Sequence, residues 1–71
     1  MHAPTAFAVG RFLVTPLTRR TETGHYAASV SVRRGMHDRI FRFLPRFDSD
    51  VLAERYALDQ GREIALQGAA A

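Results

Sequence analysis

The chain has 71 residues, no cysteine and a formal net charge of +3 at neutral pH. A chain of this length makes one small domain with a small core, and no disulfide or thiolate metal site can brace it. Its apolar runs are too short to span a membrane, and its N-terminal residues lack the basic and apolar stretches of a signal peptide. We therefore expect a cytoplasmic single domain over residues 1–71, ordered over about residues 7–66, with frayed ends at 1–5 and 67–71.

The charge is unevenly distributed along the chain. All ten basic residues are arginine. Residues 1–47 carry a net charge of +6, and residues 48–71 carry a net charge of −3. A GC-rich genome alone could favour arginine over lysine, but a planar, permanently charged guanidinium suits phosphate and guanine edges in either case. The distribution predicts a basic face that attracts polyanions, or else simply a solvated surface.

The first predicted strand covers residues 7–17, which are rich in valine, phenylalanine and leucine. Gly10 is expected to form a bulge in this strand, and Pro16 suits an edge strand or a strand end. Residues 18–24 are polar and end in glycine, a composition that is typical of a loop.

The next two predicted strands form a hairpin. Residues 25–34 alternate between inward apolar and outward polar side chains, and residues 37–44 follow after Gly35-Met36. Glycine at the first central position is typical of a type II′ turn, which pairs Arg34 with His37. The same register pairs Val30 with Phe41 and Ala28 with Phe43. Turn chemistry and hydrophobic pattern thus predict one register independently.

A C-terminal helix is predicted after the third strand, which Pro45 is expected to end. Asp48 is the expected N-cap, and Asp50 would lie favourably near the positive end of the helix dipole. A helical stripe can cover one face of the sheet: Leu52, Ala53, Tyr56, Ala57 and Ile64. Gly61 interrupts the stripe, so the helix either ends there or approaches the sheet closely. We favour a helix that continues to about residue 66.

The predicted fold is α+β, a β-β-β-α chain in which a three-stranded antiparallel meander carries one helix on one face. Pairing Phe12 with Val30 and Val14 with Ala28 gives a core of Phe12, Val14, Tyr26, Ala28, Val30, Val32, Phe41 and Phe43. The other face is left open. Its predicted rows are Arg11–Ser31–Ile40, Leu13–Ser29–Arg42 and Thr15–Ala27–Leu44.

Two functions fit this open face. The first is binding of duplex DNA, in which Arg11 and Arg42 would reach bases and the other arginines would hold the backbone: Arg19, Arg20, Arg33, Arg34, Arg39 and Arg46. The face has no aromatic side chain, which disfavours single strands bound by stacking. The alternative is a non-catalytic protein-interaction or homodimer module that uses Leu13, Ile40 and Leu44, or the free edge of the third strand.

The sequence does not indicate catalysis or metal binding. Ser29 and Ser31 lie within a strand without the context of a nucleophile, so we do not expect an enzyme. His25 and His37 start successive antiparallel strands and should lie at opposite ends of the hairpin, which separates them as metal ligands. We expect no metal, no cofactor, no membrane and no small-molecule substrate.

The span from Gly24 to Ala57 resembles two families of DNA-binding domain. The matching residues are Gly24 to Ala28 with Val30, Arg39 to Phe41, Phe47-Asp48, and Ala53 with Tyr56-Ala57. They resemble the plant ethylene-response type and the arm-site-binding domain of tyrosine integrases, which are three strands plus a helix and bind DNA through the sheet. The resemblance implies that topology and duplex DNA as a ligand, although this chain has no tryptophan where the plant domain does. The chain also resembles small proteobacterial proteins that carry no function to transfer.

Overall fold

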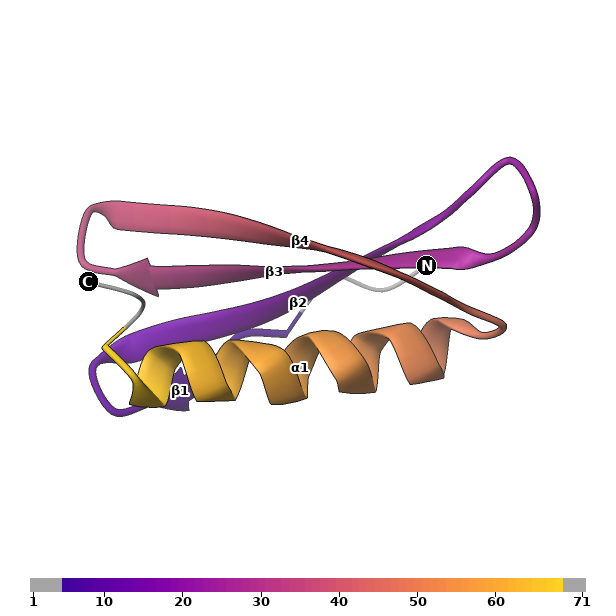
Figure 1. The fold of residues 1–71 in the computed structure, drawn as a ribbon. Coiled ribbons are helices and arrows are strands. Elements are labelled where there is room, and N and C mark those ends of the chain that lie inside the picture. Colours follow the sequence, from indigo (N-terminus) through magenta and orange to yellow (C-terminus); the bar gives the residue numbers. More distant parts are fainter. Residues whose placement is uncertain (1–4, 69–71) are drawn as a thin grey trace.

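The computed structural model describes residues 5–68, which form a four-stranded antiparallel sheet with one helix across one face (Figure 1). The elements are β1 (Phe7–Val9), β2 (Phe12–Arg20), β3 (Tyr26–Arg34), β4 (His37–Phe47) and α1 (Asp50–Leu66). The strands lie in the order β1-β2-β3-β4. The α+β class and the single C-terminal helix are confirmed, but the predicted number of strands, three, is wrong. The expected frayed ends fall largely outside the described residues.

The fourth strand arises because the predicted first strand is really a hairpin. Gly10 and Arg11 form its turn, and Gly10 has a φ of 61°, in the left-handed region that glycine enters without strain. Val9 lies opposite Phe12 and Phe7 lies opposite Val14. The bulge expected at Gly10 is therefore a chain reversal, which removes Arg11 from the predicted strand.

The hairpin of β3 and β4 has the predicted register at its turn end. Arg34 lies opposite His37, and Val30 lies opposite Phe41. Gly35 has a φ of 59° at the first central position of the turn, as the hairpin requires. Agreement between turn chemistry and hydrophobic pattern thus identified the pairing correctly.

At its far end, β4 departs from the prediction. Ser29 lies opposite Arg42, whereas Ala27 lies opposite Arg46, so residues 43–45 of β4 face only Ala28 of β3. The strand continues through Pro45, which an edge strand tolerates because its outward side needs no donor. The predictions that Pro45 ends the strand and that Ala28 simply pairs with Phe43 are therefore wrong.

This irregularity has a definite effect on the faces of β4. It adds two residues to one strand, so the alternation of faces is the same on both sides of it. Phe43 and Phe47 both turn toward α1, where their ring centroids lie 5.3 and 5.0 Å from that of Tyr56. Arg42 and Arg46 correspondingly lie on the opposite side of the sheet.

The pairing of β2 with β3 differs from the prediction by four residues. Val14 lies opposite Val32, and Thr18 lies opposite Ala28. Thr18, Arg19 and Arg20, which were expected in a loop, extend β2. An even shift of this kind leaves every side chain on its predicted face but changes its neighbours.

The core lies between the sheet and α1 and is built from small side chains: Val14, Ala28, Val30, Val32, Ala53, Ala57 and Ala65. Phe12, Tyr26, Phe41 and Phe43 pack against it but remain partly exposed. The predicted inward face of the sheet is thus confirmed. Leu52, which was expected in the helical stripe, is 49% exposed.

The helix is anchored to the sheet near its N-terminus. It continues past Gly61 to Leu66, as predicted. Its N-cap is Ser49, whose hydroxyl accepts a hydrogen bond from the Leu52 N–H at 3.2 Å, so the expectation of Asp48 as the cap is wrong. Near that end, the hydroxyl of Thr18 in β2 donates a hydrogen bond to Asp50. Over residues 5–68, the structure has no helix that is long and apolar enough to cross a membrane.

Candidate nucleic-acid interface

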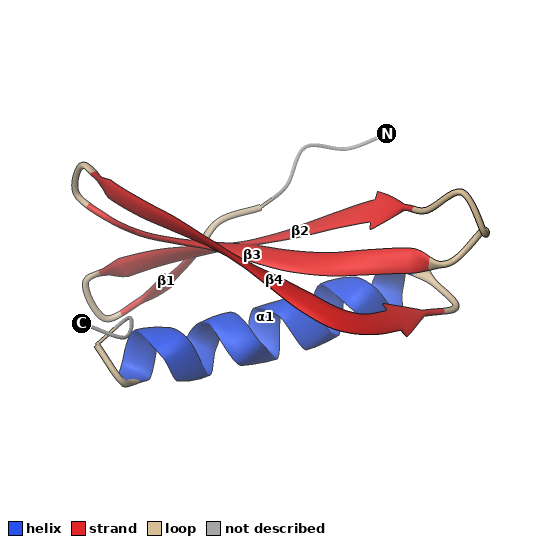
Figure 2. Ribbon diagram, turned by 45° about the horizontal axis from the view of Figure 1, so that its top comes forward, coloured by secondary structure: helices blue, strands red, loops and turns tan. Residues whose placement is uncertain are grey.

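The side of the sheet away from α1, here called the open face, is not covered by any other described element (Figure 2). Strand pairing arranges its side chains in four rows across β2, β3 and β4. The rows are Leu13–Arg33–Asp38, Thr15–Ser31–Ile40, Leu17–Ser29–Arg42 and Arg19–Ala27–Arg46. Small side chains therefore occupy much of the centre, and arginines lie at both ends.

These rows correct the predicted ones. Arg11 was expected beside Ser31, but it lies in the β1–β2 turn, and Thr15 takes its place. Leu17 takes the place expected for Leu13, beside Ser29 and Arg42. The row that was expected to be uncharged instead carries two arginines, because Arg19 and Arg46 flank Ala27.

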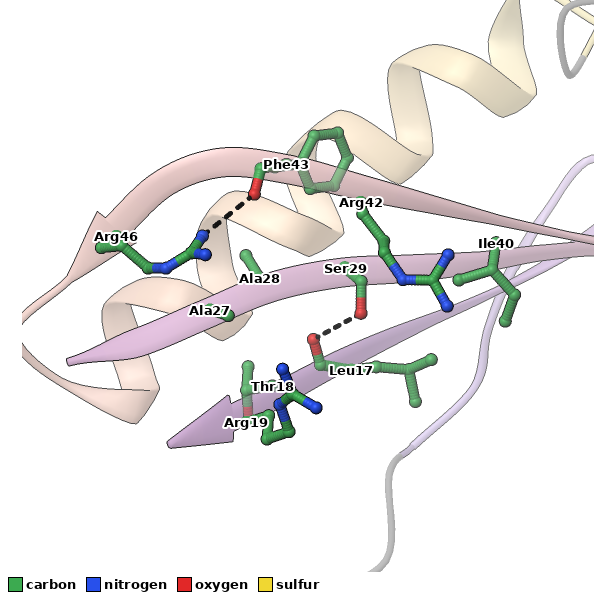
Figure 3. A pocket seen from close by; sticks show the side chains of 10 residues that line it. All are labelled: Leu17, Thr18, Arg19, Ala27, Ala28, Ser29, Ile40, Arg42, Phe43 and Arg46. Atoms are coloured by element: carbon green, nitrogen blue, oxygen red, sulfur yellow. Dashed lines mark hydrogen bonds between the residues drawn. The ribbon is translucent and has the colours of Figure 1, made fainter. Parts of the chain in front are cut away.

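Three arginines surround a hollow of about 390 Å³ on the open face (Figure 3). Arg42 extends from β4 over β3, while Arg19 on β2 and Arg46 on β4 lie on either side of Ala27. The remaining lining residues are mostly small or apolar: Leu17, Thr18, Ala27, Ala28, Ser29, Ile40 and Phe43. We call Arg19, Arg42 and Arg46 the arginine cluster.

The contacts of the arginine cluster leave its charge uncompensated. Nη1 of Arg46 donates hydrogen bonds to the carbonyl oxygens of Phe43 at 3.5 Å and Leu44 at 3.1 Å, which hold this guanidinium over the irregular part of β4. Within residues 5–68, no carboxylate forms an ion pair with a member of the cluster. A cationic surface without an internal partner is suited to an external anion.

The basic surface continues toward the β2–β3 loop. A second hollow of about 590 Å³ shares Arg19 and Arg46 with the first, and Arg20, Thr21, Glu22 and Thr23 complete its lining. The Thr21 and Thr23 hydroxyls are hydrogen-bonded within the loop, so the guanidinium groups are the donors that this hollow offers to phosphate oxygens. Glu22 is the one acidic residue in the lining of this hollow.

Contacts with the segment before α1 hold this loop in place. The Oγ1 atom of Thr23 lies 3.2 Å from Nδ1 of His25, and Nε2 of His25 lies 3.7 Å from the Asp48 carboxylate. The Thr21 hydroxyl donates to the His25 carbonyl at 3.1 Å. Both His25 and Asp48 are well exposed, so this chain of contacts resembles a loop brace more than a water-excluding catalytic site.

The other predicted arginines are dispersed. Arg33 is on the open face at the turn end, where its Nε donates to the Gly35 carbonyl at 2.9 Å. Arg34 lies on the helix side, with its guanidinium 5.8 Å from the ring centroid of Phe12. Alternation also places Arg20 and Arg39 on the helix side, opposite Tyr26 and Val32. The predicted set therefore does not form one surface.

The residues predicted for an apolar interaction face are separated as well. Leu13 and Ile40 are each 45% exposed on the open face, but Leu13 lies beside Arg33 and Ile40 lies beside Ser31. Leu44 is 91% exposed within the irregular part of β4. Sequence reasoning overlooked Met36, which is 96% exposed at the β3–β4 turn.

In the described part of the chain, no three His, Asp or Glu side chains gather into a possible metal site. The Ser31 hydroxyl donates to Asp38, so this carboxylate takes part in a cross-strand contact. The arginine cluster is therefore the candidate site. No protein-family model, curated protein or solved structure matches the chain.

Proposed function

We propose that this protein binds duplex DNA through the arginine cluster on its open face. The observation that carries the proposal is the convergence of Arg19, Arg42 and Arg46 around small side chains, without a carboxylate partner among residues 5–68. Arginine binds phosphate oxygens through paired N–H donors, and neutralised phosphates release counterions from DNA.

The shape of the open face supports a ligand with a broad surface. Ala27 and Ser29 lie at the centre of the two rows that hold the cluster, so the backbone of a ligand can approach the sheet closely. The arginines come from two different strands, β2 and β4, and would contact the ligand from both sides of β3. Contacts of this kind position a phosphate backbone and do not depend on base sequence.

The placement of the aromatic side chains favours a duplex over a single strand. The chain has five phenylalanines and two tyrosines. Phe12, Tyr26, Phe41, Phe43, Phe47 and Tyr56 pack against the core on the helix side, and Phe7 lies opposite Val14 on the same side. Proteins that hold single strands commonly stack bases on exposed aromatic rings, and the open face offers none.

The remaining charges would orient the molecule on DNA. Helix α1 carries Asp50, Glu54, Asp59 and Glu63 against Arg55 and Arg62. Helix α1 itself therefore carries more carboxylates than arginines, whereas the open face is basic. A polyanion should be attracted to the open face and repelled from α1.

The test is a fluorescence anisotropy titration of a mixed-sequence duplex at low salt. We expect wild type to bind, and Arg19→Ala combined with Arg46→Ala to bind at least about tenfold more weakly. The matched control is Arg55→Ala combined with Arg62→Ala, which removes the same charge from exposed positions of α1 and should retain most of the affinity. Absence of wild-type binding at low salt, or an equal loss in both double variants, would refute the proposal.

A further inference from the structure

The outer edge of β4 is the longest strand edge that the described residues leave without a partner. β4 has eleven residues and is the last strand of the sheet, whereas the opposite edge is formed by the three residues of β1. An edge of this length presents N–H and C=O groups that can pair with another strand. Figure 1 shows β4 at the side of the sheet away from β1.

The side chains along this edge have a self-complementary order. From the β3–β4 turn onward, every second residue reads apolar, acidic, apolar, basic and apolar: Met36 in the turn, Asp38, Ile40 and Arg42 on the open-face side of β4, and Leu44 in its irregular part. Met36 and Leu44 are 96% and 91% exposed, and Ile40 is 45% exposed. The pattern is apolar at its centre and at both ends, and the two positions between carry opposite charges. A second copy that runs in the opposite direction therefore places apolar residues opposite apolar residues and each charge opposite its counter-charge.

We infer that two copies of this chain pair through β4, antiparallel and centred on Ile40. This register places Ile40 opposite Ile40, Asp38 opposite Arg42, and Met36 opposite Leu44. Each unlike pair occurs twice because the arrangement has a twofold axis. Cross-strand pairs of opposite charge and of apolar side chains are those that stabilise antiparallel strands.

Neighbouring symmetric registers lack this complementarity. Centring the pair on Asp38 would bring two carboxylates together, and centring it on Arg42 would bring two guanidinium groups together. Like charges directly opposite one another are destabilising. The Arg42 register would also draw Pro45 into the ladder, and Pro45 has no N–H to donate.

The small core gives this pairing a further benefit. The fully buried side chains within residues 5–68 are only valines and alanines, so little apolar area stabilises the monomer. Helix α1 packs mainly against β2 and β3, and Phe41 and Phe43 of β4 stay partly exposed. A second strand beside β4 would cover part of these rings as well as Met36 and Leu44.

This inference rests on the β4 edge and shares Arg42 with the proposed binding of DNA. In the paired form, Arg42 of one copy faces Asp38 of the other, which leaves Arg19 and Arg46 as the unpaired members of the arginine cluster. Changes at Arg19 and Arg46 should therefore affect DNA affinity alone, and changes at Asp38 should chiefly affect pairing.

The first test measures mass by sedimentation from low micromolar to near-millimolar concentration, with folding of each variant confirmed by circular dichroism. We expect the wild-type mass to rise from monomer to dimer. Asp38→Arg and Arg42→Asp should each raise the dimer dissociation constant about tenfold or more, since each creates two like-charge pairs. An equimolar mixture of these two variants should recover dimer, because each charge then meets its opposite.

The second test uses the absence of native cysteine. Cα atoms directly opposite in antiparallel strands are about 4.5–5.5 Å apart, within the range that a disulfide spans. Ile40→Cys should therefore form a disulfide-linked dimer readily under mild oxidation. Met36→Cys is the matched control, because the two copies of residue 36 would be roughly 27 Å apart at about 3.4 Å per residue.

The outcomes separate clearly. A mass that rises with concentration, rescue in the mixed sample and faster cross-linking of Ile40→Cys than of Met36→Cys support the inference. A monomer mass at all concentrations overturns it. So does a mixture of the charge variants that stays monomeric, or Met36→Cys that cross-links as fast as Ile40→Cys.

Discussion

Gly61 of α1 lies directly against Val14 of β2. A Cβ atom at residue 61 would be 2.5 Å from Cγ1 of Val14 and 2.7 Å from Cγ2 of Val30. Val14 and Val30 are both completely buried and, as β-branched residues, have few alternative rotamers. Gly61 is therefore a position at which the helix approaches the sheet closely, and a side chain there would have to displace one of these valines.

We expect Gly61→Ala to destabilise the protein. Overpacking in a core costs about 1–3 kcal/mol, and alanine returns up to about 1 kcal/mol through its higher helix propensity. The expected net loss in the free energy of unfolding is about 1–2 kcal/mol, measured by urea denaturation. Gln60→Ala, one position earlier in the same helix, serves as the control and should change stability by about 0.5 kcal/mol or less. A Gly61→Ala variant as stable as wild type would show that α1 does not approach so closely.

A second prediction concerns the N-cap of α1. Ser49→Ala removes the acceptor for the Leu52 N–H and should lower the free energy of unfolding by about 1 kcal/mol. Asp48→Ala should cost less, because Asp48 makes only an exposed contact with His25 at 3.7 Å. Thermal or urea unfolding of the two variants side by side tests this order. The reverse order would identify Asp48 as the cap, as the sequence had suggested.

A third prediction concerns the form of nucleic acid. Because the open face has no aromatic side chain among the described residues, we expect a duplex to compete for the protein more effectively than a single strand of equal length. Competition against a labelled duplex, with unlabelled duplex or oligothymidine at the same salt concentration, measures the preference. Tighter binding of the single strand would contradict the assignment of the open face as the interface.

The sequence predicted which face of the sheet each side chain occupies better than it predicted which residue lies opposite on the next strand. The hydrophobic pattern has a period of two, so it distinguishes inside from outside but not between registers that differ by an even number of residues. The pairing of β2 with β3 was wrong by four residues, and Val14, Val30 and Val32 are nevertheless buried as expected. The hairpin of β3 and β4 was right because its turn supplied a second, independent constraint.

The residues of the candidate site are brought together by the pairing between strands, so the sequence predicted the site only in part. Arg42 was correctly placed beside Ser29, but the partner arginine on β2 was expected to be Arg11 and is Arg19. Thr18 and Arg19 are polar and were therefore expected in a loop, but both pair with β3, opposite Ala28 and Ala27. Arg46 lies in the cluster because β4 continues past the irregularity at residues 43–45. The sequence did not predict this, because Pro45 indicated the end of the strand.

The most direct test of the central claim is the salt dependence of duplex binding. Each phosphate neutralised contributes about 0.9 to the slope of log affinity against log salt concentration. Arg19→Ala combined with Arg46→Ala should therefore reduce the wild-type slope by about 1.8, and Arg55→Ala combined with Arg62→Ala should leave it unchanged. An unchanged slope in the first variant, or an equal reduction in both, would contradict the claim that the arginine cluster holds the DNA backbone.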